Sequence, residues 1–138
     1  MPQPERGTGA WVMAALLCAD AGFDDEGHYH IWDMSQGMIV SPSVQWAQRT
    51  LFIVIGRERP GRVTIVVTQQ PPQGPLKQLA DQTINFVSVP AGLQVKLSLT
   101  IELGMVGVHW FTVLLDGRQG VRVPFAVQHQ AADDGLPA

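Results

Sequence analysis

The chain has 138 residues, the size of one domain; 46% of them are hydrophobic and only 15% carry a charge. This composition excludes an intrinsically disordered chain, and the net charge of −3 argues against the basic field that binding to a nucleic-acid backbone requires. The single cysteine, Cys18, excludes a disulfide within the chain, and no apolar run reaches the roughly 18 residues of a membrane-spanning helix.

The N-terminal segment has two interpretations. Residues 1–10 are polar and contain prolines and glycines, so we expect a flexible lead. The uncharged stretch that follows ends in small residues near Ala21, as a secretory signal does, so export with removal of residues 1–21 is an alternative. Glu5 and Arg6 cancel in charge and the stretch also fits a strand, which favours a cytoplasmic protein that keeps its N-terminus.

The first two apolar runs are expected to form a β-hairpin. Residues 11–23 fit a helix or a strand by pattern alone. The turn signal at residues 24–27 follows, and residues 28–40 return as a second β-like run, which favours two paired strands. Cys18 lies among Leu and Ala residues in the first strand and is expected to be a buried, inert thiol.

The middle of the chain alternates strand and turn signals. Residues 51–55 are apolar and rich in β-branched side chains, which suits a strand covered on both faces. A turn at residues 59–62 leads to a strand at residues 63–68. Three prolines and a glycine in residues 69–75 predict a surface loop, and residues 76–81 could form one helical turn.

The C-terminal part contains the clearest strand. Residues 94–102 alternate strictly between apolar and polar, which places one face on a core and the other in water. Residues 108–115 and 121–128 are predicted to form a hairpin joined at Asp116 and Gly117. Pro124 cannot donate to a ladder, so the last strand is expected at an edge or at a bulge.

These elements predict an all-β domain over residues 11–128, an antiparallel sandwich of about eight strands. Turn signals separate the strands, and no segment is a convincing helix. Residues 129–138 are expected to be a disordered tail.

The order of the motifs carries a family resemblance: an opening strand, an acidic turn, a return strand and a closing hairpin occupy residues 16–21, 25–27, 28–32, 110–117 and 122–127. This order resembles a family of uncharacterised bacterial proteins with an immunoglobulin-like β-sandwich, over most of residues 14–128. The resemblance implies an antiparallel immunoglobulin-like fold. It implies no functional residues, because the family has no established activity. The chain departs from the family at residues 33–37, where related sequences tend to be rich in glycine.

His28 and His30 are the candidate metal ligands. Residues two apart in a strand share a face, so both rings could face one ion, and residues 24–26 could add carboxylate oxygens. His109 or His129 could supply a further ligand. The alternative is an ordinary polar hairpin face beside a solvated acidic turn. No catalytic or cofactor-binding motif occurs, so the sequence predicts no catalytic residues, no cofactor and no enzyme activity.

A neutral, partly apolar surface favours binding to another protein or to a second copy of the chain. Trp32, Met34, Met38 and Trp46 are predicted to form that surface, whereas Trp110 is expected in the core. We therefore expect a non-enzymatic structural or protein-interaction module that buries a sheet face or edge. A metal- or small-ligand-binding sandwich and a secreted carbohydrate-binding module are the alternatives.

Overall fold

The described part of the chain is built from β-strands and contains no helix, as expected for an all-β protein. The computed structural model describes residues 9–34, 36–57, 59–87 and 92–130. The strands are β1 (Ala10–Cys18), β2 (Asp20–Phe23), β3 (Tyr29–Trp32), β4 (Gly37–Val40), β5 (Trp46–Arg57), β6 (Gly61–Gln70), β7 (Lys77–Phe86), β8 (Leu93–Glu102), β9 (Gly107–Leu115) and β10 (Arg118–His129). No helix long and apolar enough to cross a membrane occurs in this part.

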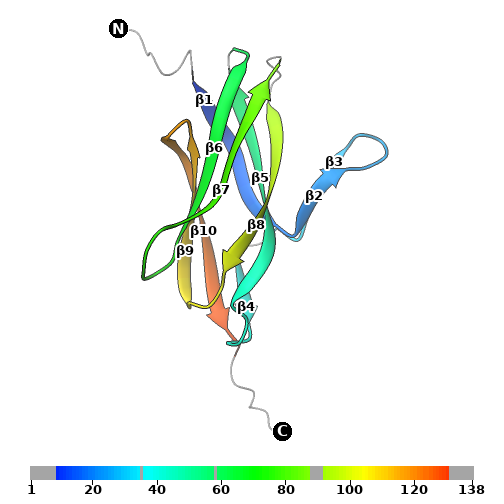
Figure 1. Cartoon of the computed structure of the whole chain (residues 1–138). Coiled ribbons are helices and arrows are strands. Elements are labelled where there is room, and N and C mark those ends of the chain that lie inside the picture. The colour runs from blue at the N-terminus through cyan, green and yellow to red at the C-terminus, as the bar shows by residue number, and fades with distance from the viewer. Residues whose placement is uncertain (1–8, 35, 58, 88–91, 131–138) are drawn as a thin grey trace.

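The strands form three sheets, and the two larger sheets share one hydrophobic core (Figure 1). The three-stranded sheet has the order β1-β5-β8, and the five-stranded sheet has the order β4-β10-β9-β6-β7. Leu51 and Leu99 of the first sheet and Phe111 and Phe125 of the second are completely buried in the same cluster. The two phenylalanine rings meet edge to face, with their centroids 6.1 Å apart.

The alternation predicted for residues 94–102 is confirmed by β8, whose side chains at 95, 97, 99 and 101 are buried while those at 94, 96, 98 and 100 are exposed. The predicted turn between β9 and β10 is confirmed as well. Asp116 and Gly117 have φ values of 51° and 83°, and two successive positive φ angles are typical of a two-residue type I′ hairpin turn.

The structure corrects the number, direction and pairing of the strands. The described residues form ten strands rather than about eight, and β4 runs parallel to β10, so the five-stranded sheet is mixed rather than antiparallel. The predicted hairpin of residues 11–23 and 28–40 is wrong in extent, because β1 pairs with β5 and β4 pairs with β10, leaving only β2 and β3 to pair with each other. The helical turn predicted at residues 76–81 is replaced by β7.

Pro124 lies where β10 has a ladder partner on one side. It pairs with Trp110 of β9, whereas β4 pairs only with residues 126–129 of β10. The missing proline N–H therefore costs no ladder bond on the β4 side. The register of β10 also shifts between Gln119 and Val121. The predicted bulge in this strand is therefore confirmed, whereas β10 is not an edge strand, because it lies between β4 and β9.

The described strands extend from Ala10 to His129. Most of the predicted lead and most of the predicted tail lie outside the described residues, at 1–8 and 131–138.

Candidate functional site

The β2–β3 hairpin, residues 20–32, projects from the two larger sheets; we call it the arm (Figure 1). Its two strands pair with each other from Asp20–Trp32 to Phe23–Tyr29, and neither belongs to a larger sheet. An isolated two-stranded hairpin is marginally stable in water, so the arm depends on whatever packs against it.

The base of the arm covers the outer side of the three-stranded sheet. Ala21 is 1% exposed and packs with Cys18 and Phe52, forming a second small hydrophobic cluster outside the main core. Leu51 and Ile53 point the other way, into that core. The prediction that residues 51–55 are covered on both faces is confirmed, and the chain's own arm covers Phe52 on the outer face.

Cys18 is completely buried beneath the arm, as predicted from its apolar neighbours. Its thiol lies 3.5 Å from the carbonyl oxygen of Thr50. Burial raises the pKa of this thiol, which disfavours the nucleophilic thiolate form.

Polar contacts fix the arm against β5 and β8. Lys96 Nζ donates to the carbonyl oxygen of Ala21 at 2.7 Å and lies 3.4 Å from Asp20 Oδ1. The hydroxyl of Thr50 donates to the carbonyl oxygen of Ala19 at 3.3 Å. The arm therefore adjoins the outer strand of the sheet at Lys96.

The turn at the tip of the arm brings the predicted metal-site residues together around a carboxylate. His30 Nε2 lies 2.6 Å from Asp24 Oδ2, and His28 Nδ1 lies 3.6 Å from the same oxygen and 3.6 Å from Glu26 Oε1. The other oxygen of Asp24 accepts the backbone N–H groups of Glu26 and His28. The hydrogen bonds from His30 and from the His28 backbone hold the pKa of Asp24 below its ordinary value.

This geometry accounts for the two histidines without an ion. Within the described residues, no group of three or more His, Cys, Asp and Glu side chains could hold a metal ion. His109, one of the two predicted further ligands, is completely buried between the larger sheets, and His129 lies at the end of β10. The metal assignment of His28 and His30 stays a prediction.

The tip of the arm is expected to loosen in acid. A carboxyl whose pKa is depressed by native contacts adds stability that is complete above its unfolded pKa of about 3.9 and is lost as the pH falls through its folded pKa. The backbone amide signal of His28 in an NMR pH titration should therefore show a step below about pH 4, where Asp24 is protonated and the hydrogen bond to its carboxylate is lost. Asp24→Asn should already show the shifted signal at neutral pH, whereas the control Asp25→Asn should titrate like the unaltered chain.

Large apolar side chains are exposed on the arm and beside it. Ile31 is 38% exposed, Trp32 49% and Met34 62%. The ring of Trp32 stacks on His30 with a centroid distance of 5.9 Å and an interplanar angle of 19°. Two of the predicted surface residues, Trp32 and Met34, are therefore exposed here.

The other two predicted surface residues differ from each other. Trp46 is 55% exposed at the start of β5, and Lys77 Nζ lies 5.3 Å from its ring centroid. Met38 is half-buried and packs against the core, because the alternation of β4 turns its neighbour Ile39 outward, where it is 69% exposed. Ile39 is an exposed residue that sequence reasoning missed, and period-two alternation from Val40 was the signal that could have found it.

The prediction that Trp110 lies in the core is wrong. Its side chain is half-buried on the outer side of β9, and the guanidinium carbon of Arg122 lies 4.2 Å from its ring centroid. Its neighbour His109 takes the inward position and is completely buried. The inward phase of the strand is set by Phe111, Val113 and Leu115.

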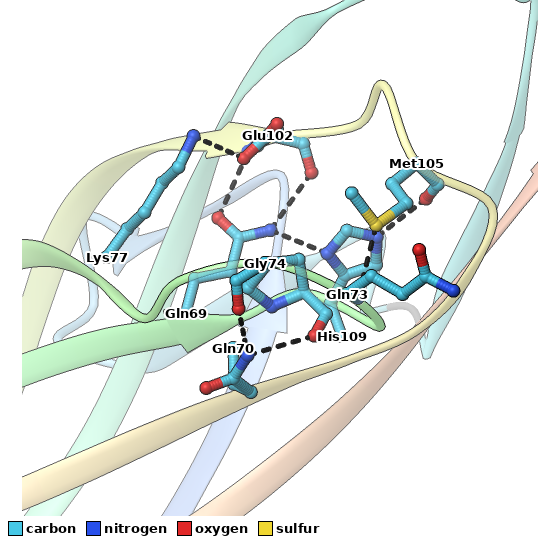
Figure 2. Close-up of polar contacts among 9 residues, drawn as sticks. Gln69, Gln70, Gln73, Gly74, Lys77, Glu102, Met105 and His109 are labelled. Atoms are coloured by element: carbon cyan, nitrogen blue, oxygen red, sulfur yellow. Dashed lines mark hydrogen bonds and ion pairs between the residues drawn. The ribbon is translucent and has the colours of Figure 1, made fainter.

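A buried polar network links β6, β8 and β9 (Figure 2). Gln69 Nε2 donates at 2.9 Å both to the carbonyl oxygen of Glu102 and to His109 Nδ1, while Gln69 Oε1 accepts the N–H of Glu102 at 3.1 Å. His109 Nδ1 is thus an acceptor, so its proton lies on Nε2, which donates to the carbonyl oxygen of Met105 at 2.7 Å. The Glu102 side chain forms an ion pair with Lys77 at 2.5 Å.

The carboxamide of Gln69 satisfies both backbone groups of Glu102, as a residue on a neighbouring strand would. It joins the two larger sheets, because Gln69 belongs to β6 and Glu102 to β8. The network contains no nucleophile and its donors and acceptors are paired with one another, which indicates a structural role. Sequence reasoning missed it, although Gln69 continues the inward phase of Val63, Ile65 and Val67.

No protein-family model matches the sequence, and a search of curated proteins finds no match. A search of solved structures finds matches at low sequence identity, among them the following two. The alkylpurine DNA glycosylase AlkC of Pseudomonas fluorescens, bound to DNA containing an abasic site analogue, has a TM-score of 0.58 at 10% identity, over 88% of this chain and 31% of that one. The β-glucosidase 3B of Thermotoga neapolitana, in complex with α-D-glucose, has a TM-score of 0.43 at 11% identity, over 83% of this chain and 16% of that one.

The similarity to the glycosylase concerns the fold alone. The chain spans about a third of the glycosylase's length, so it corresponds to one part of that larger protein.

Proposed function

We propose that the chain is a non-enzymatic protein-interaction module that binds its partner through the arm. The observation that carries this proposal is an arm whose base is anchored by Ala21, while Ile31 opposite Ala21 and the adjacent Trp32 stay exposed. Large aromatic and aliphatic side chains at such positions are typical anchors of protein interfaces. A partner that covers them would supply the packing that a two-stranded hairpin lacks.

We also infer that the scaffold is an immunoglobulin-like sandwich. In that fold one sheet contains strands A, B and E, and the facing sheet contains strands C, F and G. The order β1-β5-β8 against β10-β9-β6 supports this correspondence, with β1 as the first strand and β4 as its continuation on the facing sheet. The arm is then an insertion between β1 and β4, as expected of a functional addition to a rigid scaffold.

DNA is a poor candidate for the partner of the arm. The glycosylase in the comparison is bound to DNA, but this chain has a net charge of −3 and its arm ends in Asp24, Asp25 and Glu26. A protein that neutralises phosphates presents Lys or Arg side chains instead. We therefore propose a protein as the partner.

The double substitution Ile31→Ser with Trp32→Ser is expected to abolish partner binding. Hot-spot side chains of this kind each contribute a large part of the binding energy, so partner recovery should fall by about tenfold or more. The measurement is affinity capture from the native cells with quantitative mass spectrometry. Leu76→Ser is the matched control, since Leu76 is 57% exposed but lies outside the arm. Equal recovery of every protein by the unaltered chain and the arm variant would contradict the proposal.

A further inference from the structure

The outer strand of the three-stranded sheet leaves a long regular edge open. β8 pairs with β5 alone, and the ladder runs from Trp46–Glu102 to Ile55–Leu93 without a bulge. β8 also contains no proline. Proteins usually shorten, bulge or cover such edges, because a row of unpaired N–H and C=O groups is a template for another strand.

The hydrogen bonds at the end of β8 show which residues face the open edge. The N–H of Leu103 donates to Gln45 on the β5 side, whereas the N–H and C=O of Glu102 point away from β5 and bind Gln69. Backbone direction alternates along an antiparallel ladder, so the other even-numbered residues also face outward. These are Gln94, Lys96, Ser98 and Thr100, and within the described residues their backbone groups have no hydrogen bond on that side.

Both ends of this edge are defined. Gln69 occupies the position beside Glu102, and β8 begins at Leu93. The window between them, residues 93–101, is centred on Leu97. An antiparallel strand of the same sequence fits it with a two-fold axis at Leu97, which places Gln94 opposite Thr100 and Lys96 opposite Ser98. In this register the second β8 begins just where the Gln69 amide closes the edge.

The charges of the edge favour a second copy. Lys96 is the only charged side chain in the window, and Asp20 of the same chain lies 3.4 Å from its ammonium group. In the register about Leu97 the lysine faces a serine hydroxyl, so no like charges are directly opposed. The buried faces of the two strands also match, because Leu97 meets Leu97 and Val95 meets Leu99. This continues the hydrophobic layer from one copy into the next.

We propose that two copies of the chain pair antiparallel along β8 about Leu97 and form a two-fold dimer with a continuous six-stranded sheet. This inference rests on the proposed function of a protein-interaction module. It names a second copy of the chain as the partner of the β8 edge, which adjoins the arm at Lys96. An extended peptide of another protein is the other possible occupant of the edge, and solution mass separates the two.

The substitution Ser98→Pro tests the edge without breaking the fold. The N–H of Ser98 points away from β5, so its loss removes no ladder bond of the single chain, whereas it removes a central bond of the dimer. Sedimentation equilibrium should show dimers of the unaltered chain. For Ser98→Pro the dissociation constant of the dimer should be higher by at least about tenfold. Ser98→Ala keeps the N–H and should dimerise like the unaltered chain. Circular dichroism verifies that the variants are folded.

Disulfide trapping tests the register independently of proline. Opposite residues of a hydrogen-bonded antiparallel pair have Cα atoms about 5.5 Å apart, within the range of a disulfide. Mixing chains that carry Lys96→Cys with chains that carry Ser98→Cys should give the mixed disulfide on oxidation. A register centred on Ser98 would instead link two Ser98→Cys chains to each other.

The inference is overturned if the unaltered chain remains monomeric up to about 1 mM. It is also overturned if Ser98→Pro dimerises as well as Ser98→Ala does, or if the trapped pair is Ser98→Cys with itself. The arm variant of Ile31 and Trp32 separates the two proposals. If the unaltered chain is monomeric, the dimer is rejected, and the capture experiment still tests binding through the arm. If the chain dimerises through β8 but captures no partner through the arm, the proposed function of the arm is rejected.

Discussion

A chain that begins at Gly22 is expected not to fold. It lacks β1, which pairs with β5 over residues 10–18 and contributes the completely or almost completely buried Leu17 and Cys18. Each fully buried apolar side chain stabilises a protein by about 1.5 to 3 kcal/mol. Loss of a whole strand, its ladder and the Ala21 cover of Phe52 therefore approaches the total stability of a domain, about 5 to 15 kcal/mol.

Circular dichroism and urea denaturation should show no cooperative transition for this truncated chain. A chain that begins at Gly9 is the control, since it keeps every described strand and should unfold cooperatively. We propose on this basis that the mature protein keeps residues 10–18. Native-like unfolding of the chain that begins at Gly22 would make β1 dispensable and would favour the secreted alternative.

The sequence was informative at β8 and at the turn between β9 and β10. The strict alternation in residues 94–102 predicted β8 and its buried side chains, and the Asp116–Gly117 pair predicted the turn that closes the last hairpin. Both signals are local, because side-chain direction repeats every two residues and a type I′ turn needs two positive φ angles.

Pairing between distant strands could not be predicted in the same way. Residues 11–23 and 28–40 look like one hairpin, but Ala19 separates β1 from β2, and each half finds a different partner. The partner of β4 is the last strand of the chain, β10. Local alternation specifies which face is buried but not which strand lies alongside, since that depends on packing of the whole core.

The candidate site was predicted in part for the same reason. The exposed Trp32 and Met34 and the contact of His28 and His30 with Asp24 follow from a hairpin at this place in the chain. Met38 was misplaced because residues 28–40 were treated as one strand, which hides the independent phase of β4. The open edge of β8 is a property of the sheet order, so no local pattern could show it.

The substitution Gln69→Leu is expected to destabilise the protein by about 2 to 5 kcal/mol, although the new side chain is of similar size and apolar. Leucine cannot replace the amide, so the N–H and C=O of Glu102 and the Nδ1 of His109 would each lose a partner. Every buried polar group left unpaired costs about 1 to 3 kcal/mol. Urea denaturation measures the loss, and Gln78→Leu on the exposed side of β7 is the control, with an expected change within about 0.5 kcal/mol.

The same variant also tests whether the amide of Gln69 closes the open edge of β8 at Glu102. With the amide gone, the backbone groups of Glu102 are free to pair with another strand, so the edge no longer ends at Thr100. Gln69→Leu should therefore also pair in the register centred on Ser98, which the trap detects as disulfides between two chains that carry both Gln69→Leu and Ser98→Cys. If Gln69→Leu matches the unaltered chain in both stability and association, then Gln69 neither holds the two sheets together nor sets the end of the edge.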